Sequence, residues 1–193
     1  MKREELIRAL ADHAAASAEE EASLERLRRF VAGPSDPFAR SNPEGHVTGS
    51  AIVARSDGSA FLIVYHRKLG RWLQPGGHIE PADASCLAAA RREVMEETGV
   101  AELLPLAVRG VPSELEEGIF DVDVHQIPAN SREAAHAHFD VRYAFEARAV
   151  QLTVSDEVKA ARWVELEAVA ALNDEESIAR PVRALLGVRV SSQ

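Results

Sequence analysis

The sequence has little cysteine, no long apolar run and few basic residues, and each shortage excludes a class of function. The single cysteine, Cys86, can form no internal disulfide and belongs to no Cys-x-x-Cys pair for a zinc or redox site. The longest uninterrupted apolar run is the six residues 60–65, too short to cross a membrane, and the N-terminal stretch alternates charged with apolar residues, unlike a signal peptide. We therefore expect a cytoplasmic protein with no membrane partner.

The charge balance is acidic, with 31 Asp and Glu against 22 Lys and Arg and a formal net charge of −9. Such a charge repels phosphate polymers and anionic membranes at long range, which predicts that no nucleic acid polymer is a partner. A protein of this charge that handles phosphate must also screen its own carboxylates.

The length of 193 residues favours one domain, and 46% apolar residues are ample for a core. Apolar stripes predict two helices in the first thirty or so residues, and Ser17 followed by Glu20 has capping-box spacing for the start of the second. The stripes are Leu6, Leu10 and Ala14, then Leu24, Leu27 and Val31. Glycine and proline then predict a loop, so residues 1–44 form a helical extension and linker before a main domain at 45–193. The charged residues of the extension are expected to face solvent, and pairing into a homodimer is the alternative.

The main domain alternates strands and helices. Strands are expected at 51–54, 61–65, 120–125, 137–149 and 162–166, the first two joined as a hairpin. A helix is expected at 85–98, capped by Gly99, and two more at 167–172 and 174–186. This order predicts an α/β layered domain with a mixed sheet.

Three carboxylates lie on one side of the helix at 85–98. Glu93, Glu96 and Glu97 are three and four positions apart, so they repel one another by roughly 0.2–0.5 kcal/mol per pair, near a helix end that also disfavours anions. They therefore need a compensating cation. Oxygen ligands grouped in this way suit Mg²⁺ or Mn²⁺, which keep several waters and bridge to phosphate oxygens.

The residues around these glutamates fit the same chemistry. Gly76 and Gly77 precede the helix and let the backbone turn sharply, so that a carbonyl oxygen can approach a metal or a phosphate. Arg92 can reach Asp83 or Glu96 and hold the rotamers of neighbouring carboxylates, as outer-shell residues do for metal ligands. Cys86, Ala89 and Ala90 lie toward the glutamate side of the helix and leave space beside it.

The segment from Gly77 to Val100 resembles the Nudix box, G-x5-E-x7-R-E-U-x-E-E-x-G-U, in which U is aliphatic. Its second half, from Arg92 to Val100, matches completely. The first half departs twice, because Asp83 stands at the acidic position and eight residues separate it from Arg92. The strands and helices around the box also fit the single domain of this family, an α/β/α sandwich with a mixed sheet.

The resemblance implies hydrolysis of a nucleoside diphosphate linked to another group, by water attacking a phosphorus of the pyrophosphate. It implies Mg²⁺ or Mn²⁺ bound by Glu93, Glu96 and Glu97, together with the backbone carbonyl of Gly77, and a small nucleotide-derived substrate. Glu93 is the first choice for the base, and Arg92 completes the catalytic set. The alternatives are a Nudix-like module that binds a nucleotide without cutting it and an isomerase on the same fold.

Two polar rows on the later strands are secondary candidates. They are His136, His138 and Asp140, and Asp121, Asp123 and His125. If the two strands pair as a hairpin, the rows lie together and offer a metal ligand, a proton acceptor or substrate contacts. A solvated strand face is the simpler interpretation and the expectation for most of these residues.

Further substrate contacts are expected near the box. The candidate phosphate contacts are Arg67, Lys68, Arg71 and His78, any of which is equally compatible with a surface position. Trp72 stacks on a base or belongs to the core. Asp156 and Glu157 are candidates for a further catalytic acid, and Cys86 is expected to be a packing residue.

Overall fold

The computed structural model describes residues 3–67, 69–106, 118–129, 133–148, 151–156, 158–165, 168, 179–180 and 182–183. In these ranges the helices are α1 (Arg3–Asp12), α2 (Ala18–Ala32) and α3 (Cys86–Thr98). The strands are β1 (Gly45–Arg55), β2 (Ala60–His66), β3 (Arg71–Leu73), β4 (Gly76–His78), β5 (Leu103–Pro105), β6 (Asp121–Ile127), β7 (His136–Ala147) and β8 (Val158–Glu165).

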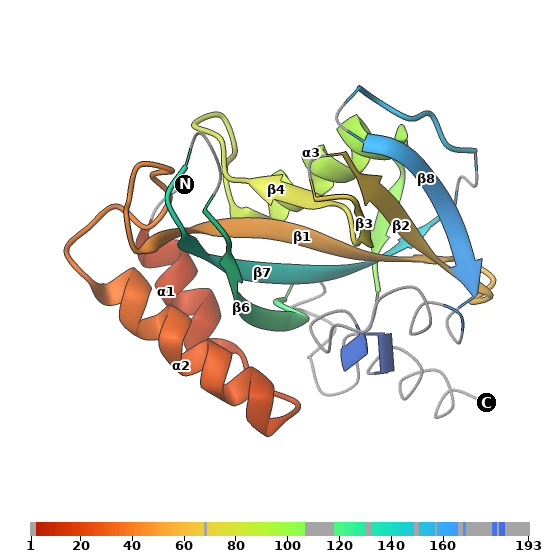
Figure 1. The fold of residues 1–193 in the computed structure, drawn as a ribbon. Coiled ribbons are helices and arrows are strands. Elements are labelled where there is room, and N and C mark those ends of the chain that lie inside the picture. Colours follow the sequence, from red (N-terminus) through yellow and green to blue (C-terminus); the bar gives the residue numbers. More distant parts are fainter. Residues whose placement is uncertain are drawn as a thin grey trace.

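All the described strands belong to one mixed sheet. The two longest, β1 and β7, run parallel and side by side across the middle of the molecule (Figure 1). The other pairings are antiparallel: β2 and β4 pair with β1, β3 and β8 pair with β2, and β5 and β6 pair with β7. The α/β class, the mixed sheet and the hairpin of β1 and β2 were correctly predicted.

The two N-terminal helices pack against the sheet. Leu10, Leu24 and Leu27 are at most 1% exposed and share one apolar core with α3 and the strands, and Phe30 stacks on Phe139 of β7 at 3.9 Å between ring centroids. The Ala14 part of the predicted stripe is wrong, because α1 ends at Asp12 and Ala14 is exposed. The division into an extension and a main domain remains a prediction.

Glu20 attaches α2 to the strands. Ser17 caps the helix by accepting a hydrogen bond from the backbone N–H of Glu20, as expected. The Glu20 carboxylate accepts from the N–H of Ala16, one residue before the cap, and from the N–H of Val122 in β6. Oε1 of Glu20 also lies 2.8 Å from Nε2 of His13, between α1 and α2, and the side chain is almost completely buried. Glu20 therefore links both helices to the sheet.

The middle of the sheet, β1 and β7, is buried on both faces. Along β7, Phe139, Val141 and Phe145 point into the core with the helices. The opposite face carries the two polar rows, and the pairing of β6 with β7 brings them together. The expectation that most of these residues are solvated is wrong, since the three aspartates are at most 6% exposed and the three histidines are partly buried.

None of the described helices is both long and apolar enough to cross a lipid bilayer. The helices expected at 167–172 and 174–186 lie mostly outside the described residues, and residues 168, 179–180 and 182–183 of those stretches are helical.

Candidate active site

Helix α3 begins and ends as its sequence predicts. The Ser85 side chain accepts a hydrogen bond from the N–H of Ala88, and Gly99 ends the helix in the left-handed conformation, with φ 73°. The sequence predicts that the small residues Cys86 and Ala89 leave open space beside the glutamates. This prediction is wrong, because they instead let α3 approach β1. A Cβ atom on Gly49 would lie 2.7 Å from the Cys86 carbonyl oxygen and 3.4 Å from the Ala89 Cβ.

The glycines of β4 bring the backbone close to two glutamates of α3. The N–H of Gly76 donates to Oε2 of Glu97 at 3.2 Å. A Cβ atom on Gly77 would lie 2.4 Å from Oε1 of Glu93, so only glycine leaves room for this carboxylate. Glu93 and Glu97 are therefore buried, 7% and 4% exposed, between the helix and β4.

Arg92 is the centre of the acidic cluster. Its guanidinium donates to both carboxylate oxygens of Asp83, at 3.1 and 3.0 Å, to Oε1 of Glu93 at 3.0 Å and to Oε2 of Glu96 at 2.9 Å. It also donates to the carbonyl oxygen of His78 at 2.9 Å. The expected contacts with Asp83 and Glu96 are both present, and the extra residue in the box does not prevent the first. The hydrogen bonds that Arg92 donates to Asp83 raise the pKa of Arg92, so the guanidinium stays charged.

The cluster carries more negative charge than Arg92 balances. The carboxylates of Asp83, Glu93 and Glu96 contact one guanidinium, and a fourth carboxylate, of Glu97 on the same helix, accepts from the Gly76 N–H. Burial raises the pKa of Asp83, but the hydrogen bonds from Arg92 and the Glu80 backbone outweigh it and keep that pKa below its ordinary value. A hard divalent cation fits this donor set, because carboxylate oxygens are its preferred ligands and its charge would offset the excess.

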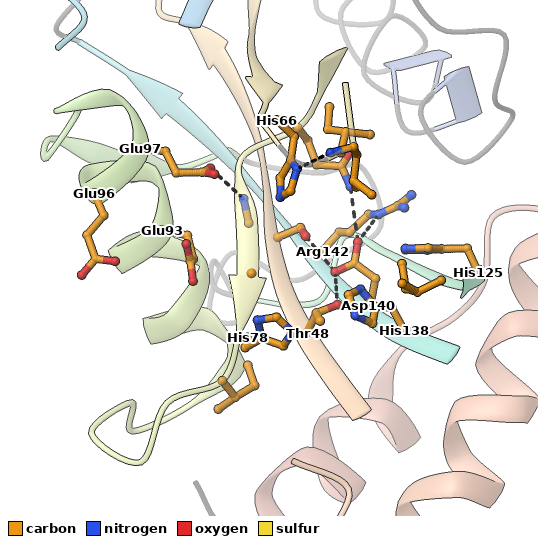
Figure 2. A pocket seen from close by; sticks show the side chains of 18 of the residues that line it. Thr48, His66, His78, Glu93, Glu96, Glu97, His125, His138, Asp140 and Arg142 are labelled. Atoms are coloured by element: carbon orange, nitrogen blue, oxygen red, sulfur yellow. Dashed lines mark hydrogen bonds and ion pairs between the residues drawn. The ribbon is translucent and has the colours of Figure 1, made fainter. Parts of the chain in front are cut away.

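A cavity of about 1060 Å³ lies in front of these residues. We call α3 the acidic helix. The wall of the cavity includes the three glutamates of this helix and the polar face of β1, β6 and β7. Figure 2 shows Glu93, Glu96 and Glu97 on one side of this space and His125, His138, Asp140 and Arg142 on the other, with β4 and β1 between. One cavity is therefore bordered by two chemically different surfaces.

A buried ionic network forms part of the second surface. Asp140 accepts hydrogen bonds from Thr48 and Ser50 at 2.8 Å each, from Gln74 at 3.3 Å and from Arg142 at 2.8 Å. Arg142, 1% exposed, also pairs with Asp121 and Asp123, and Arg180 pairs with the same two carboxylates. Because Asp140 has four donors, it holds the wall of the cavity in place.

Imidazoles form the rest of this surface. We call it the imidazole face, and its members are His46, His78, His125, His136 and His138. Burial, and after it repulsion from neighbouring charged groups, lowers the pKa of His46 to about 4, of His78 to about 3 and of His138 to about 2. These three imidazoles are therefore neutral near pH 7.

Some of the remaining candidates line the cavity and others lie away from it. Arg67, Arg71 and Asp156 line the cavity, and Arg67 donates to the carbonyl oxygen of Asp156 at 3.0 Å. Trp72 packs edge-on against Tyr65 and beside the smaller apolar cluster, so the core interpretation is correct. Cys86 is buried, and burial raises the pKa of its thiol. Lys68 and Glu157 lie outside the described residues.

Sequence reasoning missed several residues of this site. His46, Thr48 and Ser50 alternate along β1, the two-residue period that would place them on one face beside β7. That signal was present, but the strand was expected only at 51–54, whereas β1 begins at Gly45, so these three residues lay outside the predicted strand. Arg40 also lines the cavity, from the loop before β1, and no pattern marked it.

Residues 45–186 match the family model of the NUDIX domain. The chain belongs to the Nudix family. With the glutamates of its box intact, this Nudix protein is a pyrophosphohydrolase, an enzyme that acts on phosphoric anhydride bonds. The α/β/α sandwich implied by the resemblance is thereby confirmed.

Solved structures support the same fold. The NUDIX domain of Shewanella oneidensis NrtR, complexed with ADP ribose, is 21% identical over 79% of this chain and 94% of that chain, with a TM-score of 0.52. A NUDIX-family hydrolase from Clostridium perfringens is 22% identical over 75% and 97%, with a TM-score of 0.51. A C. elegans Ap4A hydrolase binary complex is 16% identical over 75% and 98%, with a TM-score of 0.50. No curated protein matches the chain.

Proposed function

We propose that this Nudix protein hydrolyses a pyrophosphate bond in a nucleoside diphosphate linked to another group, with Mg²⁺ or Mn²⁺ held by Glu93, Glu96 and Glu97. The observation that carries the proposal is the Arg92 cluster, in which three carboxylates gather around one guanidinium at the wall of a cavity of about 1060 Å³, with Glu97 of the same helix also at that wall. Such a cavity has room for a small nucleotide-derived molecule.

The metal requirement rests on charge. When bound, a divalent cation neutralises phosphate oxygens and makes a nearby water more acidic. Glu97 and Glu93 are buried and fixed by the β4 backbone and Arg92, whereas the Glu96 side chain is 46% exposed and is held by Arg92 from one side. The backbone carbonyl of Gly77 is the further ligand that we propose.

The protein's own residues supply the remaining steps. Glu93 is our first choice to accept the proton of the attacking water, since its carboxylate borders the cavity. Arg92 positions Glu93 and Glu96. Arg67 and Arg71 border the same cavity and are proposed to contact the phosphates of the substrate, with His78 and His138 on the opposite wall.

The substrate class is supported by structural neighbours. One neighbour is an Ap4A hydrolase and another was solved with ADP ribose, and both molecules contain a phosphoric anhydride next to a nucleoside. We propose a substrate of this class and, in line with the acidic net charge, no nucleic acid polymer. The cytoplasmic location and the homodimer remain predictions.

A substrate panel tests the proposal. Ap4A, ADP ribose, nucleoside diphosphate sugars, oxidised nucleoside triphosphates and coenzyme A derivatives would be incubated with Mg²⁺ or Mn²⁺, and phosphate products measured. We expect turnover of at least one compound, and a kcat about 100-fold lower in Glu97→Gln, because the loss of one ligand weakens the stabilisation of the transition state.

The matched control is Glu25→Gln, which removes an exposed glutamate from α2, outside the residues that line the cavity. It should hydrolyse the substrate at the wild-type rate. Equal rates in wild type and Glu97→Gln would refute the assignment of the acidic helix. Binding of a nucleotide without release of any product would favour the module that binds without cutting.

A further inference from the structure

The imidazole face brings histidines from four strands to one place. His46 of β1 is opposite His138 of β7, His138 is opposite His125 of β6, and His78 of β4 is opposite Thr48 of β1. The ring centroid of His46 lies 4.8 Å from that of His138, 4.8 Å from that of His78 and 5.1 Å from that of His136. The strand register therefore clusters side chains that are far apart in the sequence.

Three of these histidines present a set of metal-ligand atoms. One ring nitrogen from each of His46, His136 and His138 lies within 4.8 Å of the other two, and no other such group of three is present among the described residues. In a tetrahedral zinc site with bonds of about 2.0–2.1 Å, ligand nitrogens are about 3.3 Å apart. Small side-chain rotations would close the difference.

His46 has a buried ring with no polar partner. It is 2% exposed, and neither of its ring nitrogens has a hydrogen-bond partner among the residues that the structure describes. Burying such a group unpaired is unfavourable, because its hydrogen bonds to water are lost and not replaced, so most buried imidazoles have a partner. A metal ion in the centre of the cluster would be that partner.

Hydrogen bonds at the edge of the cluster fix the orientation of the other rings. The Nδ1 of His136 lies 2.8 Å from the carbonyl oxygen of Ala134, which can only accept, so Nδ1 carries the hydrogen and the lone pair is on Nε2. The Nδ1 of His125 lies 3.0 Å from the Asp123 carboxylate, with the same consequence. Histidines that ligate metals are oriented in this way by carbonyl or carboxylate groups.

We propose that His46, His136 and His138 form a site for a late first-row divalent metal ion, represented by Zn²⁺, that is separate from the acidic helix. Imidazole nitrogen suits Zn²⁺, Co²⁺ and Ni²⁺, whereas Mg²⁺ prefers the oxygens of the glutamates. Three protein ligands leave a further position for water, for His78 or for an oxygen of a bound molecule. The rings that line the cavity, His78 and His138, place this site at its wall.

The main alternative is an anion site, in which protonated histidines bind phosphate. The structure disfavours it, because protonating these rings would place several positive charges about 5 Å apart around the buried ring of His46, whereas a metal ion binds the unprotonated rings. Inorganic phosphate serves as the probe for this alternative in the experiment below.

The experiment titrates Zn²⁺ by calorimetry, and Co²⁺ by visible absorption, into the full-length protein after removal of metals with a chelator. We expect one tight Zn²⁺ per chain and the visible bands of a Co²⁺ ion with nitrogen ligands. His136→Ala and His138→Gln should each weaken Zn²⁺ binding by about two orders of magnitude, because each loses one of three ligands. Circular dichroism of both variants checks that they are folded. Because His136 lies at the edge of the cluster, His136→Ala should disturb the fold less than His138→Gln.

Two controls separate this site from the proposed hydrolytic site. His66→Gln removes a histidine that is not one of the three ligands, and Glu93→Gln/Glu97→Gln removes the carboxylates of the acidic helix; both should keep the tight Zn²⁺ site. The proposal is wrong if Zn²⁺ does not bind tightly, if a folded His136→Ala binds it as wild type does, or if the glutamate variant abolishes binding. Inorganic phosphate at millimolar concentration would be titrated into the metal-free protein as well. Phosphate binding that is lost in His138→Gln would establish the anion site instead.

Discussion

The acidic helix and the imidazole face border the same cavity but are built in opposite ways. The acidic helix takes its carboxylates from one continuous segment, and one partly exposed guanidinium, Arg92, collects them. The imidazole face draws its rings from four strands, and the fully buried Arg142 network lies beside it. The first surface concentrates carboxylates around a single guanidinium, and the second is neutral or paired.

This difference assigns catalysis to the acidic helix and stability of the fold to the buried network beside the imidazole face. Carboxylates grouped at a cavity attract a cation and then a phosphate, as hydrolysis requires. Buried pairs such as Asp140 and Arg142 cost desolvation energy and fix one arrangement of the strands. We therefore expect changes in the acidic helix to reduce activity with little loss of stability, and changes behind the imidazole face to do the reverse.

The largest expected effect is on stability, from Arg142→Met. Three buried carboxylates, Asp121, Asp123 and Asp140, would lose a shared partner, which costs about 3–5 kcal/mol when one member of a buried pair is removed. Urea denaturation followed by circular dichroism measures this loss. Arg26→Met, on the exposed side of α2, is the matched control and should change the free energy of unfolding by less than about 0.5 kcal/mol. A loss below about 1 kcal/mol for Arg142→Met would contradict the rigid role of this surface.

The next effect is on activity, from Gly77→Ala. The new Cβ would lie 2.4 Å from Oε1 of Glu93, so the end of that flexible side chain must move. Misplacing a reacting group by about 1 Å can reduce the rate about 100-fold, or about 2.7 kcal/mol in the barrier. Steady-state kinetics measure the change, while the free energy of unfolding should fall by less than about 1 kcal/mol.

A double variant tests whether this loss acts through Glu93. In a Glu93→Gln background, Gly77→Ala should add little, since the group that it displaces is already inactive. Full additivity of the two losses would show that Gly77 acts through something other than Glu93.

The smallest effect concerns the attachment of α2 behind the strands. Glu20→Gln weakens the hydrogen bonds from Ala16 and Val122, which we expect to cost about 1–2 kcal/mol. Burial raises the pKa of Glu20, but the hydrogen bond from His13 and those from the backbone outweigh it, and the pKa lies below its ordinary value.

The sign of the pH dependence follows from that shift. The stabilisation is present above the pKa of a glutamate in the unfolded chain, about 4.3, and is lost as the pH falls through the lower pKa of the folded state. Below about pH 5, the free energy of unfolding should fall more steeply with decreasing pH in wild type than in Glu20→Gln. Denaturation curves from pH 7 to pH 3 measure both slopes, and parallel slopes would remove Glu20 from this role.

The acidic helix could be predicted from the sequence because its geometry is local. The spacing of Glu93, Glu96 and Glu97, the Ser85 and Gly99 ends of α3 and the reach of Arg92 all follow from one helix and the turn before it. The five longer strands followed from the period of apolar residues and the mixed sheet from the order of the elements, whereas β3, β4 and β5, of three residues each, were not predicted.

The imidazole face could not be predicted in the same way, because it depends on strand register. The sequence showed His136, His138 and Asp140 as one row, but only the parallel pairing of β1 with β7 brings His46 beside His138. The burial of that face was also missed: alternation shows which residues share a face, and it does not show what covers the face.

The most direct test of the account is a calorimetric titration with Mn²⁺, in wild type and in Glu93→Gln/Glu97→Gln, with His136→Ala as the matched variant from the imidazole face. We predict that the double glutamate variant binds Mn²⁺ much more weakly than wild type, and that His136→Ala binds it with wild-type affinity. Equal Mn²⁺ affinity in wild type and the glutamate variant would contradict the claim that the acidic helix holds the catalytic metal.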